Sequence, residues 1–107
     1  MDARLLSRLG TFRQLEIFLK VAEHNSIARA AQELHLSHSA VSIQVKKLSD
    51  TLGMPLHEVI GRKLYLTEAG QEVVAASWEL VSVVTRLDER LDDLKGLHTG
   101  THHRTRR

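Results

Sequence analysis

Cysteine is absent from the 107-residue sequence, proline occurs once, and aromatic residues make up only 4% of the chain. The absence of cysteine removes the thiolate ligands of many zinc sites and fits a reducing compartment. The shortage of aromatic residues predicts an aliphatic core. No apolar run approaches the roughly 18 residues of a membrane span, and the N-terminus lacks the apolar region of a signal peptide. We therefore expect a soluble, cytoplasmic protein with no membrane partner.

The charged residues divide the chain into a basic front and an acidic rear. Residues 1–67 carry nine Lys and Arg against six Asp and Glu, and residues 68–95 carry three against seven. Residues 96–107 add three Arg and no acid, which gives the whole chain a charge of +2. This distribution predicts that the front of the chain meets an anionic partner.

Two short helices are predicted in the first third of the chain. Thr11 and Gln14 match a capping box at the start of the first helix, and Ser26 is a favoured N-cap for the second. The buried face of each helix follows the spacing i, i+3, i+4, i+7. These faces are Leu15, Phe18, Leu19 and Ala22 in the first helix, and Ile27, Ala30, Ala31 and Leu34 in the second.

The stretch 37–52 predicts a third helix with two different faces. After a tight turn at His35-Leu36, Ser37 is the N-cap, and Gly53-Met54-Pro55 stops the helix. The outer face carries hydroxyls, one isoleucine and a cation, which suits a DNA major groove better than a core. Two short helices joined by so tight a turn predict a helix-turn-helix. The apolar stripe of the third helix is Val41, Val45, Leu48 and Leu52.

Two strand-compatible segments follow, residues 56–60 and 64–66, on either side of Gly61-Arg62-Lys63. They predict a β-hairpin wing. Its cationic tip suits phosphates or the minor groove, and the alternative is a solvated surface turn.

The last predicted helix, capped by Thr67, is long. Its apolar residues recur at steps of three and four and follow a heptad pattern from Leu80 onward. A stripe of this length exceeds what a three-helix core covers, so we expect it to pair with the same helix of a second chain. The alternative is that the stripe packs only within its own chain. The stripe consists of Val73, Ala76, Leu80, Val84, Leu87, Leu91 and Leu94, and Gly96 and Gly100 mark the predicted end of the helix.

These elements predict a mainly α fold, a winged helix-turn-helix with a small β-hairpin wing and a long C-terminal dimerisation helix. The expected division is a flexible extension at 1–10, the DNA-binding domain at 11–66, the dimerisation helix at 67–95 and a disordered basic tail at 96–107. Although the tail contains His98, His102 and His103, nothing supplies a carboxylate or thiolate beside them, so we expect no metal site.

The sequence resembles the N-terminal DNA-binding region of the bacterial LysR-type transcriptional regulators over roughly residues 11–95. The stretch 58–63 is closer to the subgroup that controls carbon-fixation operons. The resemblance implies a winged helix-turn-helix, a linker helix that forms the dimer, and a ligand-sensing domain after residue 95. The chain lacks that domain, so we expect either a fragment or a short form without an effector site. The matching segments are Phe12-Arg13-Gln14-Leu15 with Phe18, Ser26 with Ala30-Ala31 and Leu34, Ser37 with Ser39-Ala40-Val41-Ser42, Leu48 with Leu52-Gly53, and Leu66-Thr67-Glu68-Ala69-Gly70.

The chain departs from the family pattern at three positions. His38 stands where the family usually has Gln, His57 where it usually has Phe, and Val59 where many members have Arg. Gln can form paired hydrogen bonds to adenine, whereas imidazole offers a different donor and acceptor pattern.

The predicted function is sequence-specific binding of double-stranded DNA as a homodimer, with higher oligomers left open, in transcription regulation. The chain is expected to carry no catalytic residue and no cofactor. The alternative is an interaction module that pairs with a full-length relative and blocks it. The residues predicted to read bases are His38, Ser39, Ser42, Ile43 and Lys46; those predicted to hold phosphates are Arg13, Ser37, Lys47, Arg62 and Lys63; and the dimer seam is predicted at Val73, Leu80, Val84, Leu87, Leu91 and Leu94.

Overall fold

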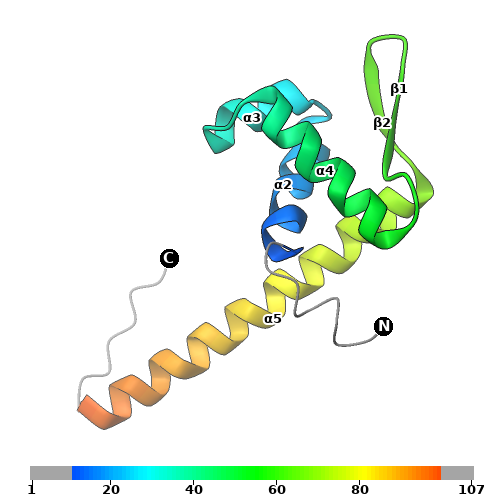
Figure 1. Cartoon of the computed structure of the whole chain (residues 1–107). Coiled ribbons are helices and arrows are strands. Elements are labelled where there is room, and N and C mark those ends of the chain that lie inside the picture. The colour runs from blue at the N-terminus through cyan, green and yellow to red at the C-terminus, as the bar shows by residue number, and fades with distance from the viewer. Residues whose placement is uncertain (1–10, 100–107) are drawn as a thin grey trace. The chain divides into compact units, whose positions relative to one another are not determined.

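The computed structural model describes residues 11–99, with four helices and one hairpin within that range (Figure 1). The described chain falls into two compact units that meet between Ser77 and Trp78. Within this range no helix is long and apolar enough to cross a membrane. The expected extension at 1–10 lies outside the described residues. The elements in chain order are α2 (Thr11–His24), α3 (Ile27–Leu34), α4 (His38–Leu52), β1 (His57–Ile60), β2 (Lys63–Leu66) and α5 (Glu68–Thr99).

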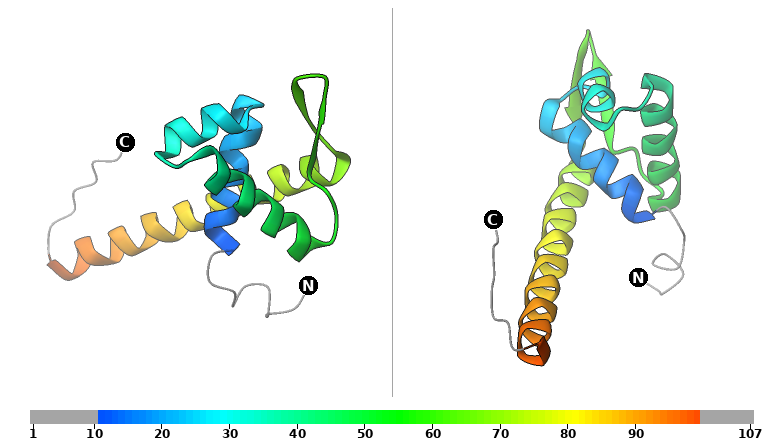
Figure 2. Two further views of the ribbon diagram at one scale, coloured as in Figure 1. Left: turned by 45° about the horizontal axis from the view of Figure 1, so that its top comes forward. Right: turned by 90° about the vertical axis from the view of Figure 1, so that its left-hand side faces the viewer.

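The first unit is built on three helices that all contact one another, α2, α3 and α4. Figure 2 shows α3 and α4 packed against α2, with the hairpin projecting beside them. The predicted helix-turn-helix with its wing is therefore confirmed. The fully buried apolar residues are Ile17, Phe18, Val21, Ala30, Ala31, Val41, Val45, Leu48 and Leu56.

The buried face of α2 differs from the predicted one. Ile17 and Val21 are fully buried beside Phe18, whereas Leu15 is only partly buried against the core. Leu19 and Ala22 are likewise half-buried. The helix contacts both α3 and α4, so the side buried most deeply is centred on Ile17, Phe18 and Val21. Of the predicted stripe, Phe18 is fully buried and Leu15 packs partly against the core.

Two left-handed residues make the tight turns between the helices. Asn25 has a φ of 50° and His35 a φ of 58°. Ser26 then begins α3, where its side chain accepts a hydrogen bond from the Arg29 N–H at 3.1 Å, as predicted. His35 ends α3, and its N–H donates to the carbonyls of Ala31 and Gln32. Leu36 follows and packs partly against the core.

The hairpin consists of β1 and β2 paired antiparallel, with Val59 opposite Leu64 and Ile60 opposite Lys63. Gly61 turns the chain with a φ of 67°. Lys63 therefore belongs to β2 rather than to the turn, so the predicted tip of three residues is shorter in the structure. Arg62 remains in the turn and is exposed.

Helix α5 starts where Thr67 caps it, since the Gly70 N–H donates to Thr67 Oγ1 at 3.0 Å. Its first turns belong to the first unit, where Ala69, Val73 and Val74 pack against the core. The helix continues through Gly96 to Thr99, beyond the predicted end at residue 95. A glycine inside a helix costs only about 1 kcal/mol, so Gly96 does not end it. The remainder of the predicted tail, residues 100–107, lies outside the described residues, and so do the side chains of its three histidines.

Candidate nucleic-acid interface

Helix α4 is fixed at both ends. Ser37 accepts a hydrogen bond from the Ala40 N–H at 3.0 Å, and Gly53 ends the helix in the left-handed conformation with a φ of 81°. The Gly53 N–H donates to the Ser49 carbonyl at 2.8 Å. Both predicted caps are thus confirmed, and the caps set which side chains of α4 face outward.

The buried side of α4 consists of Val41, Val45 and Leu48, each at most 1% exposed. Leu52, the fourth residue of the predicted stripe, is 38% exposed, so this part of the prediction is wrong. Leu52 is the last helical residue, next to the Gly53 cap, where the helix has passed the end of the three-helix core.

The residues predicted to read bases lie together on the outer side of α4. His38, Ser39 and Lys46 are exposed, and Ile43 leaves 52% of its surface uncovered. Ser42 is half-buried. Lys46 lies 3.5 Å from the carboxylate of Asp50, one turn along the same exposed face. The structure therefore brings these five side chains onto one surface, which offers hydroxyls, an imidazole, an ammonium and one apolar group.

The residues predicted to hold phosphates come from three elements. Arg13 of α2 is exposed and pairs with Glu16 at 2.9 Å. Ser37 uses its oxygen to cap α4, but its O–H remains able to donate. Lys47 of α4 is exposed.

Arg62 and Lys63, the other two predicted phosphate contacts, belong to the wing. Both are exposed, and a shallow groove at the wing is lined by these two residues together with Tyr65 and Asn25. The wing thus presents two adjacent cations on its outer part.

The base of the wing is tied to the start of α5. Thr67 Oγ1 donates to the Pro55 carbonyl at 2.8 Å, and the Thr67 N–H donates to the Leu56 carbonyl at 3.1 Å. Leu56 itself is 1% exposed. Thr67 therefore serves two purposes, as helix cap and as anchor for the segment that leads into β1. The local sequence pattern predicts only the first of these two roles.

A hydrogen bond between α2 and α4 was not predicted. Gln14 Nε2 donates to Gln44 Oε1 at 3.2 Å. The side chain of Gln14 thus connects two helices, whereas the predicted capping box assigned it to the start of its own. Nothing in the local spacing pairs residues 30 positions apart.

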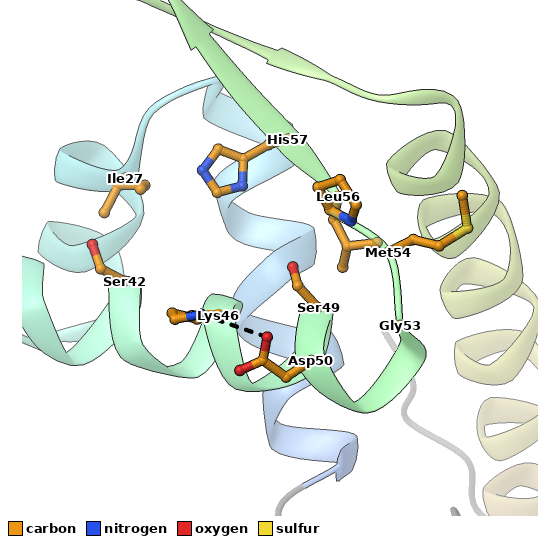
Figure 3. Close-up of a pocket in the computed structure, with 10 residues that line it drawn as sticks. Ile27, Ser42, Lys46, Ser49, Asp50, Gly53, Met54, Leu56 and His57 are labelled. Atoms are coloured by element: carbon orange, nitrogen blue, oxygen red, sulfur yellow. Dashed lines mark ion pairs between the residues drawn. The ribbon is translucent and has the colours of Figure 1, made fainter.

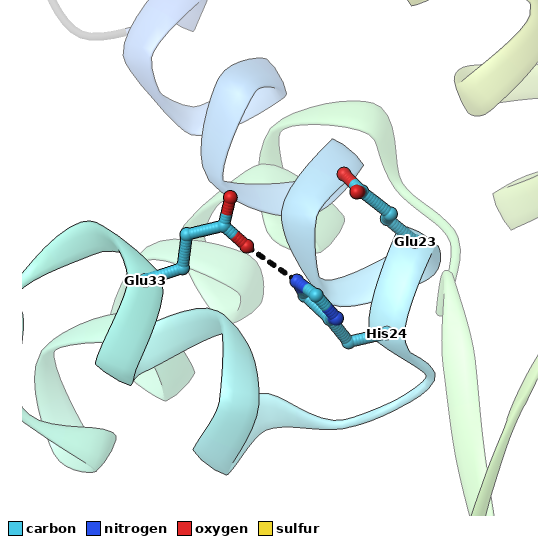
Figure 4. Close-up of side chains that lie close together, drawn as sticks. All are labelled: Glu23, His24 and Glu33. Carbon is cyan, nitrogen blue, oxygen red and sulfur yellow. Dashed lines mark hydrogen bonds and ion pairs between the residues drawn. The ribbon is translucent and has the colours of Figure 1, made fainter.

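A cluster of ion pairs joins α2 to α3 (Figure 4). His24 Nε2 lies 2.5 Å from Glu33, and Lys20 Nζ lies 3.0 Å from Glu33 and 3.4 Å from Glu23. The hydrogen bond from His24 is the main reason why the pKa of Glu33 is lowered, and Lys20 adds to it. The pKa of Lys20 is raised, chiefly by its hydrogen bond to Glu33. Although Glu23, His24 and Glu33 bring potential metal ligands within 4.8 Å of one another, the Lys20 ammonium already pairs with both carboxylates.

The predicted dimer seam divides into two parts. Val73 packs against the core of the first unit, so its surface is partly covered within the chain and it does not belong with the others. The remaining five residues form an exposed apolar stripe, in which the exposed fraction of each residue lies between 37% for Leu80 and 59% for Val84. The other three are Leu87, Leu91 and Leu94. Trp78, 55% exposed, lies outside the predicted stripe.

A sequence model of the bacterial regulatory helix-turn-helix proteins of the lysR family matches residues 12–71. The chain belongs to the LysR family. The matched residues run from the start of α2 to the first turn of α5, and so include the whole helix-turn-helix and the wing. The predicted resemblance is confirmed.

Curated relatives of this LysR-family chain include transcriptional regulators of the RuBisCO operon by name. It is 47% identical over 91 residues to the HTH-type transcriptional activator CmpR of Synechocystis, which covers 85% of this chain and 30% of CmpR. It is 46% identical over 91 residues to the RuBisCO operon transcriptional regulator of Allochromatium vinosum, with the same coverage. The chain thus spans about 30% of the length of these relatives.

Solved LysR-family structures share the fold. The structure of the CbnR DNA-binding domain in complex with DNA matches with a TM-score of 0.73 and 32% identity, over 78% of this chain and 97% of that one. The BenM DNA-binding domain with catB site 1 DNA matches with a TM-score of 0.73 and 26% identity, over 78% and 94%. These matches support the winged helix-turn-helix fold assigned from the sequence.

Proposed function

We propose that this LysR-family chain binds double-stranded DNA sequence-specifically as a homodimer and acts in the regulation of bacterial transcription. The observation that carries the proposal is the outer surface of α4. It presents Ser39, Ile43 and Lys46 from a helix whose two ends are capped and whose opposite side is fully buried. A rigid, narrow, polar helix face is the usual means of reading base edges in the major groove.

The wing and α2 supply the phosphate contacts in this proposal. Arg13, Lys47, Arg62 and Lys63 are exposed cations, and such contacts fix the register of a protein on DNA without reading its sequence. Five or six of them per subunit would make the affinity fall steeply with salt. Two solved relatives, the DNA-binding domains of CbnR and BenM, are bound to DNA in their structures, which supports the assignment.

The second copy is needed because one α4 face is too small to specify an operator. We infer that the apolar stripe from Leu80 to Leu94 pairs with the same stripe of a second chain. Two linked recognition helices then read a palindrome-like site with half-sites about one helical turn apart. The proposal places the protein in the cytoplasm with the DNA and includes no catalytic step.

The test is selection of bound duplexes from a random DNA pool by the unmodified chain. We expect one enriched, palindrome-like sequence with two half-sites. A Lys46→Ala, Lys47→Ala variant should lose most of the enrichment, whereas Arg86→Ala, which removes an exposed cation on α5, should retain it. If no sequence is enriched although the chain pairs with a full-length relative in a mixed pull-down, the interaction module is the better description.

A further inference from the structure

An open hollow lies between the recognition helix α4 and the segment that leads into the wing (Figure 3). Its volume of about 570 Å³ is many times the roughly 30 Å³ that one water molecule occupies in the liquid. One wall carries Ser42, Lys46 and Ser49 of α4, and the other includes Leu56 and His57. The hollow is thus large enough for several water molecules, and the side chains of Ser42, Lys46 and Ser49 offer them polar partners.

The wall on the wing side is held in place. Leu56 is 1% exposed, and its carbonyl and that of Pro55 both accept hydrogen bonds from Thr67. His57 comes directly after these anchored residues and pairs with Leu66 in the hairpin. The backbone of His57 is therefore held at the base of the hairpin, beside the start of α5.

His57 carries a buried polar atom without a partner. Its Nδ1 is the one buried side-chain nitrogen or oxygen among the described residues that forms no hydrogen bond. An unpaired buried polar group destabilises the folded state, and in native proteins such groups are rare. In Figure 3 the imidazole ring and the hydroxyls of Ser42 and Ser49 border the same space. His57 is among the residues that line the hollow, so water held there would lie beside its ring.

The hollow borders the surface that is proposed to read DNA. Ser42 and Lys46 belong both to the proposed reading face and to the lining of the hollow. DNA placed against α4 would cover the mouth of the hollow and enclose the water inside. Ordered water at such an interface can bridge side chains to bases and carry specificity.

We propose that His57 is a specificity-determining residue that acts from the wing through Ser42. On DNA binding the imidazole forms a hydrogen bond, through water in the hollow, to the hydroxyls of Ser49 and Ser42, and thereby fixes the orientation of the Ser42 side chain against its base pair. His57 does not touch the DNA and is a positioning residue. This inference rests on the proposed function, because it needs DNA to close the hollow.

Lys46 and Asp50 are the charged side chains that line the hollow. They pair with each other at 3.5 Å, so the bridge from His57 to Ser42 does not require either charge. The inference therefore concerns which base is preferred and leaves the number of phosphate contacts unchanged.

The experiment repeats the DNA selection with His57→Phe, His57→Asn and the unmodified chain. Phe fills the space of the imidazole but has no polar atom, whereas Asn retains a polar atom near the position of Nδ1. We expect His57→Phe to lower discrimination at one base position of each half-site by roughly fivefold, the low end for one base pair. His57→Asn should restore the preference, and the salt dependence of binding should be the same for all three chains.

Two further variants make the outcome unambiguous. Ser49→Ala should reproduce the change caused by His57→Phe, and Met54→Leu, which alters an apolar residue of the same lining, should not. Thermal unfolding shows whether each variant is folded. If the unmodified chain selects a sequence and His57→Phe selects the same one with equal discrimination at every position, this inference is wrong and the proposed function stands. If the unmodified chain selects no sequence, both are wrong.

Discussion

The backbone of Gly70 packs directly against the carbonyl group of Leu56. The contact is so close that a Cβ atom at residue 70 would lie 2.0 Å from the Leu56 carbonyl oxygen. The oxygen cannot move away easily, since it accepts the Thr67 N–H at 3.1 Å and Leu56 is buried. Only glycine therefore allows the start of α5 to approach the base of the wing this closely.

Gly70→Ala should destabilise the fold by roughly 1–3 kcal/mol, the usual cost of overpacking. Denaturant unfolding measures the change. Gly96→Ala adds the same methyl group to the same helix away from this contact, and because alanine favours a helix it should leave stability unchanged or raise it. Equal stability of the Gly70 variant and the unmodified chain would show that the contact with Leu56 is looser than the structure indicates.

Ile43→Ala should relax the preference at one base position by on the order of 1 kcal/mol, because the apolar contact with a thymine methyl group is lost. The comparison is a binding-site selection with the unmodified chain. Val83→Ala removes apolar surface from a residue of similar exposure, 51% against 52%, on α5, and should leave the preference intact. Unchanged discrimination in the Ile43 variant would remove this residue from the proposed reading face.

Arg62→Ala combined with Lys63→Ala should weaken binding to every DNA sequence to a similar degree. The logarithmic salt slope should fall by about 0.9 for each phosphate contact that is lost. Titrations at several salt concentrations measure both effects, and Arg90→Ala in α5 is the matched control. If the affinity did not change, the wing would be a solvated surface hairpin.

Leu87→Asp should convert the proposed dimer to monomer at micromolar concentration, because burying an unpaired carboxylate in an apolar seam costs several kcal/mol. Sedimentation velocity measures the association state. Arg86→Asp introduces the same carboxylate beside the stripe instead of within it, and it should remain dimeric. A monomeric unmodified chain under the same conditions would contradict the proposed seam.

The Glu33 carboxyl should titrate below its ordinary pKa of 4.5, chiefly because His24 hydrogen-bonds to the carboxylate. A lowered pKa means that the unfolded chain binds this proton more readily. The stabilisation is therefore present above about pH 4.5 and is lost as the pH falls through the lowered pKa. An NMR titration measures the pKa, which His24→Ala should raise toward 4.5 and His38→Ala should not alter. A pKa that is the same in both variants would contradict the role of His24.

Local chemistry in the sequence predicted the elements of the fold. The caps at Ser26, Ser37 and Thr67 lie where predicted, since an N-cap depends on residues only three positions away. The stop at Gly53 was predictable for the same reason. The stripe of α4 was correct at Val41, Val45 and Leu48 because a helix packed on one side keeps a regular period.

What the sequence did not predict depends on contacts between distant elements. Ile17 replaces Leu15 at the centre of the α2 face because two helices, rather than one, pack against it. Gln14 finds its partner on α4, and Glu33 finds His24 across a turn, and no spacing rule links such pairs. The period of α4 predicted which of its residues lie on the outer side, and their contacts with DNA stay a prediction. The hollow beside His57 requires knowledge of where the wing returns to α4.

The wing itself has little buried surface. Three of the four residues of β1 are exposed, and β2 alternates between exposed and half-buried residues. A two-stranded ladder with so few core contacts is marginally stable alone, so its amide hydrogens should exchange with solvent much faster than those of α4. Local opening confined to the tip, beyond the base that Thr67 anchors, would let the wing fit operators whose minor grooves differ in width while His57 keeps its place.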